Sequence, residues 1–203
     1  KMAVGGTSFD LEKLTNIAKT YFSRKSGEEV FTETLAWAKK HDAEYANILE
    51  NNKEDMIKFL SIEKDGDRPR KDIAKYSDVK EEFSYAIDSL FELEGYKKLE
   101  SEKTYDTTLV KEYLNILDLD VTNDEWFATV KEFAVANGYA ASPKEYKKDP
   151  ENFKGHVGDV CEAIRVIVTG RTKSPDLFSI MKILGKDKIN ERIAMFETYQ
   201  ANK

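Results

Sequence analysis

Apolar residues recur every three or four positions along most of the chain, which is the spacing of one face of an α-helix. The pattern is clearest in four groups of residues: Leu14, Ile17, Ala18 and Tyr21; Phe83, Ala86, Ile87 and Leu90; Leu109, Tyr113, Ile116 and Leu117; Leu177, Ile180, Met181 and Leu184. No sustained alternation of apolar and polar residues, the pattern of a half-buried strand, is present. The pattern predicts an all-α protein.

Residues typical of helix ends border these apolar groups. Three hydroxyl residues have a glutamate three positions later, as in the capping box that begins a helix: Ser26, Thr122 and Ser142. A proline follows both Ser142 and Ser174, and proline suits the first turn of a helix. Three glycines come directly after apolar segments and suit the left-handed residue that follows a helix: Gly138, Gly170 and Gly185. We expect helices to begin and end at these positions.

Two polar segments interrupt the helical pattern. The first, residues 64–71, is a basic loop that contains Pro69, and the second, residues 93–106, predicts a connection between subdomains. We therefore expect two consecutive helical subdomains, residues 1–100 and 101–203. No internal repeat of about 30 to 45 residues is present, which disfavours a helical solenoid.

Composition narrows the class of protein further. Of the 203 residues 40% are hydrophobic and 34% are charged, and no apolar run approaches the roughly 18 to 20 residues of a membrane span. Cys161 is the only cysteine, which excludes an internal disulfide and suits a reducing cytosol. With only two histidines besides, the chain offers no ligand set for structural zinc. Because the first residues also lack a secretory signal, we expect a cytoplasmic protein without a metal.

The net charge of −6 conceals an asymmetry along the chain. Residues 144–192 contain 11 Lys and Arg against 8 Asp and Glu, a net charge of +3, whereas the remaining residues carry −9. A polyanion should therefore prefer this C-terminal quarter of the chain.

The basic loop at 64–71 is one candidate for binding an anion. Arg68, Arg70 and Lys71 surround Pro69, whose restrained backbone could present the three cations together. A solvated loop is the other interpretation of the same residues.

The segment 163–178 is the richer candidate. Arg171 and Lys173 lie in a short linker before a predicted helix start, and the backbone N–H groups of a helix start attract anions. Phe178, just inside that helix, could stack on an exposed base. Leu177 and Phe178 could equally be core residues, so both interpretations stay open.

Two other functional patterns are disfavoured. A DNA-binding helix–turn–helix over 175–196, hinged at Gly185, would need a basic recognition helix, but the charges of 187–193 are balanced. His41 and His156 lie far apart, and neither has a serine or cysteine at a convincing catalytic spacing. We therefore expect neither DNA binding nor nucleophilic catalysis.

Several motifs match a known family. The strings IRVIVTGRT (164–172), SPDLF (174–178) and ILGK (183–186) lie within a segment, 152–193, that closely resembles the C-terminal anticodon-binding region of bacterial glutamyl-tRNA synthetase. The strings FDLEKL (9–14) and PRKDIA (69–74) are similar to the helical, stem-contacting part that follows the catalytic domain in that family. The resemblance spans nearly the whole chain and is weakest from about 93 to 121.

The resemblance implies roles for particular residues. In the family the corresponding elements lie at the anticodon bases, which points to five residues here: Arg165, Ser174, Pro175, Leu177 and Phe178. Charge alone adds Arg171 and Lys173 as partners for tRNA phosphates. The resemblance places the cations of the first loop toward the tRNA stem: Arg68, Arg70 and Lys71.

The catalytic half of such a synthetase has no counterpart in the sequence. No His-Ile-Gly-His-type signature and no strand–helix alternation of a nucleotide-binding domain are present. Lys1 and Met2 are similar to the start of the family's second signature loop, from which Ala3, Val4 and Gly5 depart. This alignment implies a C-terminal fragment that is not catalytic on its own. ATP and Mg²⁺ would belong to the parent enzyme, with no cofactor in this chain.

The resemblance thus implies a region that holds and reads glutamate tRNA for an ATP-dependent ligase. We expect a monomer whose partners are tRNA and a parent catalytic domain in cis, without membrane or DNA. Two alternatives remain: the anticodon-binding region of a class I lysyl-tRNA synthetase, and a free-standing helical protein-interaction module. A glutaminyl enzyme is disfavoured, because its anticodon region is a β-barrel and no strand pattern occurs here.

Overall fold

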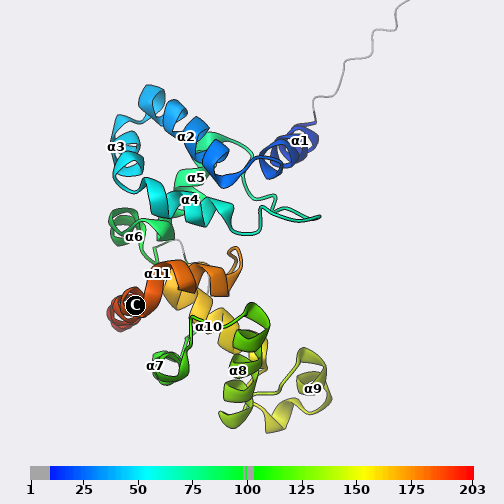
Figure 1. The fold of residues 1–203 in the computed structure, drawn as a ribbon. Coiled ribbons are helices and arrows are strands. Elements are labelled where there is room, and N and C mark those ends of the chain that lie inside the picture. Colours follow the sequence, from blue (N-terminus) through cyan, green and yellow to red (C-terminus); the bar gives the residue numbers. More distant parts are fainter. Residues whose placement is uncertain (1–9, 98, 100–102) are drawn as a thin grey trace, which may run out of the picture. The chain divides into compact units, whose positions relative to one another are not determined.

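Helices joined by turns and loops make up the protein in a computed structural model that describes residues 10–97, 99 and 103–203 (Figure 1). No strand occurs in these residues, and one isolated bridge pairs Ala140 with His156. The prediction of an all-α protein is confirmed. Among the helices of the described residues, none combines the length and the apolar character needed to cross a membrane.

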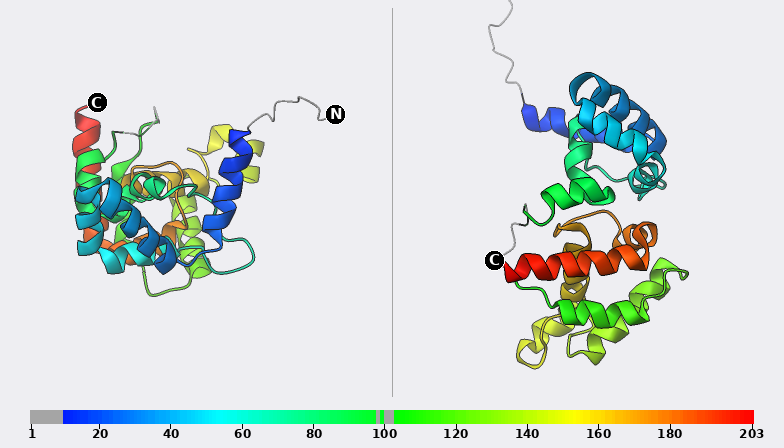
Figure 2. Two further views of the ribbon diagram at one scale, coloured as in Figure 1. Left: turned by 90° about the horizontal axis from the view of Figure 1, so that it is seen from above. Right: turned by 90° about the vertical axis from the view of Figure 1, so that its left-hand side faces the viewer.

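Residue contacts divide the chain between Ser84 and Tyr85 into two units, which Figure 2 shows in two further views. The helices before the division are α1 (Leu11–Ser23), α2 (Gly27–His41), α3 (Ala43–Asn51), α4 (Lys53–Ser61) and α5 (Tyr76–Glu82). A short 3₁₀ helix, η1 (Ser84–Ala86), spans the division. The helices after it are α6 (Asp88–Glu94), α7 (Thr107–Ile116), α8 (Asn123–Ala136), α9 (Pro143–Lys148), η2 (Pro150–Asn152), α10 (Val157–Thr169) and α11 (Leu177–Ala201).

The first unit is organised around α2, which packs against α3, α4 and α5. Its core residues are almost completely buried: Val30, Phe31, Leu49, Met56 and Phe59. The start of α2 follows from the sequence, because Ser26 Oγ accepts from the Glu29 backbone N–H at 3.1 Å and the Glu29 carboxylate accepts from the Ser26 N–H at 2.8 Å. This reciprocal capping box was predicted and is confirmed.

The second unit is organised around α10, which packs against α7, α8 and α11. The apolar face of α10 is buried along its length: Val157, Val160, Ala163, Ile164, Val166, Ile167 and Val168. The start of α8 is fixed by the predicted capping box of Thr122 and Glu125. Beyond the end of α8, Ala140 exchanges backbone hydrogen bonds with Gly155 and Val157, which ties this end of α8 to the start of α10.

One buried guanidinium joins three parts of the second unit. Arg192, on α11, is 1% exposed. Its Nη2 donates to the Tyr85 carbonyl at 3.0 Å and to Asp88 Oδ1 at 3.2 Å, while Nη1 donates to the Val168 carbonyl at 3.4 Å. The guanidinium carbon lies 3.4 Å from the ring centroid of Phe91. The sequence indicated neither this burial nor these partners.

Tyr96 adds a second tie to the same place. Its buried hydroxyl lies 2.6 Å from the Ile167 carbonyl oxygen and 2.9 Å from that of Arg192. Burial raises the pKa of Tyr96, so the hydroxyl keeps its proton and donates it. Together with Arg192, it attaches residues 85–96 to α10 and α11. The division between the two units consequently lies between Ser84 and Tyr85. This is earlier in the chain than the boundary near residue 100 that the polar segment 93–106 suggested. The assignment of the two parts to tRNA stem and anticodon remains a prediction.

The start of α11 corrects one expectation. Asp176, rather than Ser174, caps the helix, because its carboxylate accepts from the Ser179 backbone N–H at 2.8 Å. Ser174 and Pro175 therefore precede the helix instead of forming its first turn. Asp176 is the cap because its carboxylate accepts from both the backbone N–H and the hydroxyl of Ser179, whereas the Ser174 hydroxyl donates to the Pro175 carbonyl.

The three predicted helix-ending glycines all have positive φ angles. Gly138 (φ 84°) follows α8 and Gly170 (φ 69°, ψ 16°) ends α10 in the left-handed conformation, as expected. Gly185 differs: at φ 77° and ψ 163° it breaks the helical geometry within α11 in a conformation that is essentially restricted to glycine. The interruption of the helix predicted at Gly185 is therefore present, but not in the left-handed helical conformation that was expected.

We predict that Arg192→Leu lowers the free energy of unfolding by about 3 to 5 kcal/mol, because it leaves buried carbonyl groups without a donor. Lys188→Ala is the matched control, since Lys188 also pairs with Asp88, at 2.7 Å, but on the surface. This control should change stability by less than about 1 kcal/mol. Urea unfolding followed by circular dichroism measures both values. Equal, small losses would show that Arg192 does not hold the unit together.

Candidate functional site

The turn between α10 and α11 holds most of the residues singled out in the sequence. Gly170 begins it, and a Cβ atom added there would lie 2.9 Å from the Gly95 carbonyl oxygen, so only glycine fits. Thr169 Oγ1 donates to the Arg165 carbonyl at 2.7 Å and lies 3.2 Å from the Arg171 backbone nitrogen, whose N–H donates to it. Asp176 closes the turn as the cap of α11. We call residues 165–178 the α10–α11 cassette.

Arg165 and Ser174 meet inside this cassette although nine positions separate them. Arg165 Nε donates to Ser174 Oγ at 3.0 Å, and Ser174 Oγ donates to the Pro175 carbonyl at 2.8 Å. Arg165 makes no other hydrogen bond within the described residues, and its side chain is half-buried. Its two terminal nitrogens are therefore available to a ligand, while Nε fixes the direction of the guanidinium group.

Leu177 and Phe178 lie in the core, which is one of the two interpretations that the sequence left open. Leu177 is 2% and Phe178 is 3% exposed. The Phe178 ring stacks on Trp126 of α8, with centroids 5.2 Å apart and an interplanar angle of 18°, and Lys182 Nζ lies 5.3 Å from its centroid. Neither face of the Phe178 ring is exposed, so Leu177 and Phe178 belong to the apolar core on which the polar residues of the cassette lie. Pro175 is buried as well.

The residues of the cassette that reach solvent are polar. Lys173 is exposed, whereas Arg165, Arg171 and Ser174 are half-buried. The first turn of α11, which the sequence offered as an anion site, is occupied by the carboxylate of Asp176 itself. Side-chain cations, rather than the helix start, are therefore what the cassette presents to an anion.

The structure adds residues of α8 that the sequence did not connect with the cassette. Asn123 Nδ2 donates to Asp176 Oδ1 at 2.9 Å, and Trp126 forms the stack with Phe178. Phe127, the next residue, has an exposed ring. The Thr122 capping box indicated that a helix begins here, but nothing in the sequence indicated which segment it packs against.

The basic loop does not present its three cations together. Arg68 and Lys71 are exposed, but the Arg70 side chain is only 9% exposed. Arg70 Nε lies 2.8 Å from Asp72 Oδ2, Nη2 donates to the Leu60 carbonyl at 3.3 Å, and the guanidinium carbon lies 4.9 Å from the Phe83 ring centroid. Arg70 therefore belongs to the interior of the first unit, which leaves Arg68 and Lys71 as the cations that this loop exposes.

Of the remaining candidates, His156 and Cys161 lie in the described residues and do not form a catalytic arrangement there. His156 caps α10, because its Nδ1 accepts from the Gly158 backbone N–H at 2.9 Å. Burial raises the pKa of the Cys161 thiol to about 11, which makes it a poor nucleophile. Across the described part of the chain, no three His, Cys, Asp or Glu side chains are grouped to hold a metal ion. Lys1 and Met2 lie outside the described residues.

A family profile and several curated relatives match this chain. The family profile described as "Anticodon binding domain" matches residues 145–196, which include the whole cassette. The "Glutamate--tRNA ligase" of Acetivibrio thermocellus is 38% identical over 193 residues, which cover 95% of this chain and 35% of the relative. Those of Clostridium perfringens strain 13 and Sorangium cellulosum are 36% and 35% identical, over 95% and 97% of this chain and 36% and 35% of their own lengths. The chain thus spans about a third of the length of these curated relatives.

We predict that Phe178→Ala lowers the free energy of unfolding by about 3 to 5 kcal/mol, because it empties the space against Trp126. Phe127→Ala removes an exposed ring from the same region and should change stability by less than about 0.5 kcal/mol. Thermal and urea unfolding of the two variants test the difference. A Phe178→Ala protein as stable as Phe127→Ala would place the Phe178 ring at the surface.

Proposed function

The chain is homologous to one segment of the glutamate–tRNA ligases, and on that premise we propose that it binds the anticodon and stem of glutamate tRNA. In this role it positions the tRNA for ATP-dependent aminoacylation by a catalytic domain outside the chain. The observation that carries the proposal is the hydrogen bond between Arg165 and Ser174, which joins two of the predicted anticodon residues within the matched domain.

The chemistry of the cassette suits an unpaired base flanked by phosphates. A guanidinium group with one nitrogen fixed and two free can donate a pair of hydrogen bonds to the edge of a base. Ser174 holds Arg165 in place and can itself exchange hydrogen bonds with a nucleotide. Lys173 and Arg171 supply positive charge beside them for the tRNA backbone. The buried pair Leu177 and Phe178 acts by supporting this surface.

The same proposal includes a contact with the tRNA stem, a monomeric state, a catalytic domain in cis and a cytoplasmic location. The first unit would contact the tRNA stem through Arg68 and Lys71, and the protein would act as a monomer joined in cis to its catalytic domain, where ATP and Mg²⁺ bind. A cytoplasmic location fits Cys161, which is a free thiol. The relatives named above are glutamate ligases, which does not favour the lysyl-tRNA synthetase or the protein-interaction module.

Arg165→Ala and Lys173→Ala should separate base reading from phosphate binding. We predict that Arg165→Ala weakens binding of glutamate tRNA by about 1 to 3 kcal/mol and reduces discrimination against a tRNA with one changed anticodon base. Lys173→Ala should weaken both tRNAs alike, and Thr172→Ala, on the same turn, should change neither. Fluorescence anisotropy titrations measure the affinities, and thermal melts verify the fold. Equal losses for the two tRNAs in Arg165→Ala would remove base reading from this residue.

The salt dependence of binding should identify the phosphate contacts. Each neutralised phosphate contributes about 0.7 to 0.9 to the slope of log K against log salt concentration. We predict that Lys173→Ala, Arg68→Ala and Lys71→Ala each reduce this slope. Glu63→Gln in the same loop region as Arg68 serves as a control that removes a negative charge. A slope unchanged in all three lysine and arginine variants would place the tRNA on another surface.

A further inference from the structure

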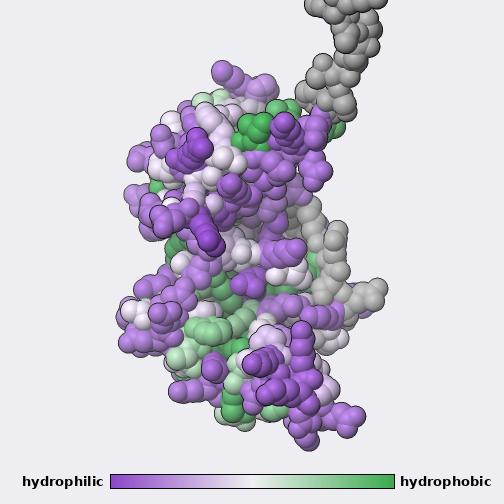
Figure 3. All heavy atoms as spheres, turned by 90° about the vertical axis from the view of Figure 1, so that its right-hand side faces the viewer, coloured by the Kyte–Doolittle hydropathy of each residue, from purple (hydrophilic) through white to green (hydrophobic). Residues whose placement is uncertain are grey.

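Helix α1 exposes an apolar stripe that none of the described residues of its own unit covers. Four large side chains recur at spacings of three, three and four residues and are between 50% and 68% exposed: Leu11, Leu14, Ile17 and Tyr21. This spacing places them on one side of the helix. In Figure 3, strongly apolar side chains reach the surface of the first unit where α1 faces the viewer.

Only the last part of α1 is packed within the unit. Phe22 and Ser23 are its buried residues, and the Phe22 ring makes an edge contact with Tyr76 at 5.2 Å between centroids. Lys25 ties the following turn to α2 through Glu33, at 2.6 Å, and its Nζ lies 4.6 Å from the Tyr21 centroid. The preceding turns of α1 project without a partner from within the unit's described residues.

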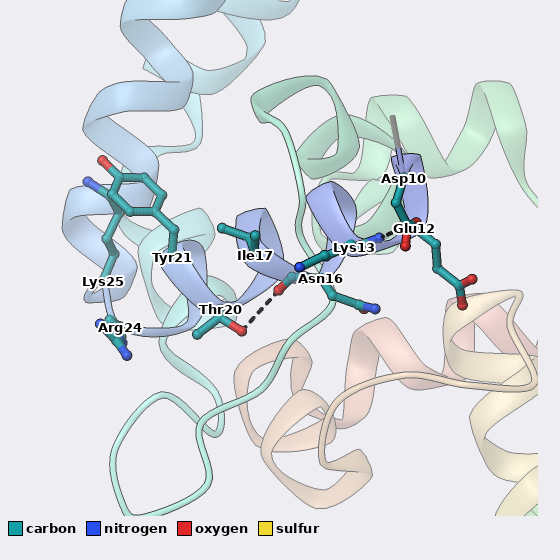
Figure 4. A pocket seen from close by; sticks show the side chains of 9 residues that line it. All are labelled: Asp10, Glu12, Lys13, Asn16, Ile17, Thr20, Tyr21, Arg24 and Lys25. Atoms are coloured by element: carbon teal, nitrogen blue, oxygen red, sulfur yellow. Dashed lines mark hydrogen bonds between the residues drawn. The ribbon is translucent and has the colours of Figure 1, made fainter. Parts of the chain in front are cut away.

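The apolar stripe borders a shallow surface with a polar edge. Figure 4 shows Ile17 and Tyr21 along the helix, beside the polar side chains of Lys13, Asn16 and Thr20. All the residues that line this surface come from α1 and its immediate flanks. An apolar strip with a polar edge is the anatomy of a contact between proteins rather than of a pocket for a small molecule.

The size of the stripe argues against a stable contact between separate chains. Four large side chains about half exposed present on the order of 400 Å², whereas a stable interface between free partners needs about 800 Å² on each side. A contact within one polypeptide needs less area, because covalent linkage supplies a high effective concentration. The stripe therefore suits a partner joined to this segment and not a second copy of the chain.

The relatives indicate what such a partner is. Their match includes 95% of this chain but only 35% of the Acetivibrio thermocellus ligase, so about two thirds of that protein lies outside the matched segment. We infer that the apolar stripe of α1 docks on this remaining part of the ligase and thereby fixes the first unit relative to it. The inference rests on the proposed function in taking a ligase as the partner.

The test compares α1 in two settings. The full 203-residue chain is studied alone and in a hybrid in which it replaces the matched segment of the Acetivibrio thermocellus ligase. Amide hydrogen exchange of α1 is the readout, which does not depend on tRNA binding or catalysis. Ile17→Glu is the test variant. Thr15→Glu is the control, because it adds the same charge to an exposed position on the side of α1 opposite Ile17.

We expect exchange of α1 to be at least tenfold slower in the hybrid than in the chain alone. Ile17→Glu should abolish this protection in the hybrid without changing the melting temperature of the chain alone, and Thr15→Glu should do neither. Equal exchange in the two settings, or protection that survives Ile17→Glu, would overturn the inference. So would concentration-dependent protection of the chain alone, which indicates a second copy, or protection on adding tRNA, which indicates an RNA surface. Loss of tRNA binding with α1 still protected would contradict the proposed function only.

Discussion

The buried guanidinium of Arg192 is the constraint on which the second unit depends. Removing a cation from water is unfavourable unless hydrogen bonds and charge replace the lost hydration. Here two carbonyl groups, the Asp88 carboxylate and the face of Phe91 do so. Because these partners come from α10 and from residues 85–91, Arg192 ties α11 to both segments. The α10–α11 cassette joins these two helices, so its geometry depends on how Arg192 holds α11 against α10.

The cassette is a thin polar layer on an apolar support. Trp126 and Phe178 stack beneath it, so that the turn is held by packing as well as by hydrogen bonds. Above them, Arg165 is oriented by Ser174, and Asp176 occupies the start of α11. The cassette therefore combines the cations of Lys173 and Arg171 with one guanidinium group, that of Arg165, whose direction is fixed. In the proposed function, the first two would attract the phosphate backbone and the third would contact one base.

Arg70 and the apolar residues of α1 show where sequence patterns mislead. Arg70 lies between Pro69 and Lys71 in a polar loop, but it is buried because Asp72, the Leu60 carbonyl and Phe83 surround its guanidinium group. Leu14 and Ile17 follow the period of a buried helix face, yet both are exposed. Charge and periodicity describe a side chain, whereas burial depends on which segment lies opposite it.

The sequence by itself determined the elements of this protein and the neighbourhood of its candidate site. Helical period, the capping boxes at Ser26 and Thr122 and the left-handed Gly170 are local features, and each depends on residues within a few positions. The motifs likewise located the cassette. Only the tertiary structure decided that Phe178 is buried against Trp126. Likewise, only the structure showed that Arg192 and Tyr96 attach residues 85–96 to the second unit. These outcomes depend on contacts between residues tens of positions apart, such as Trp126 with Phe178 and Tyr85 with Arg192, and no local pattern encodes such pairing.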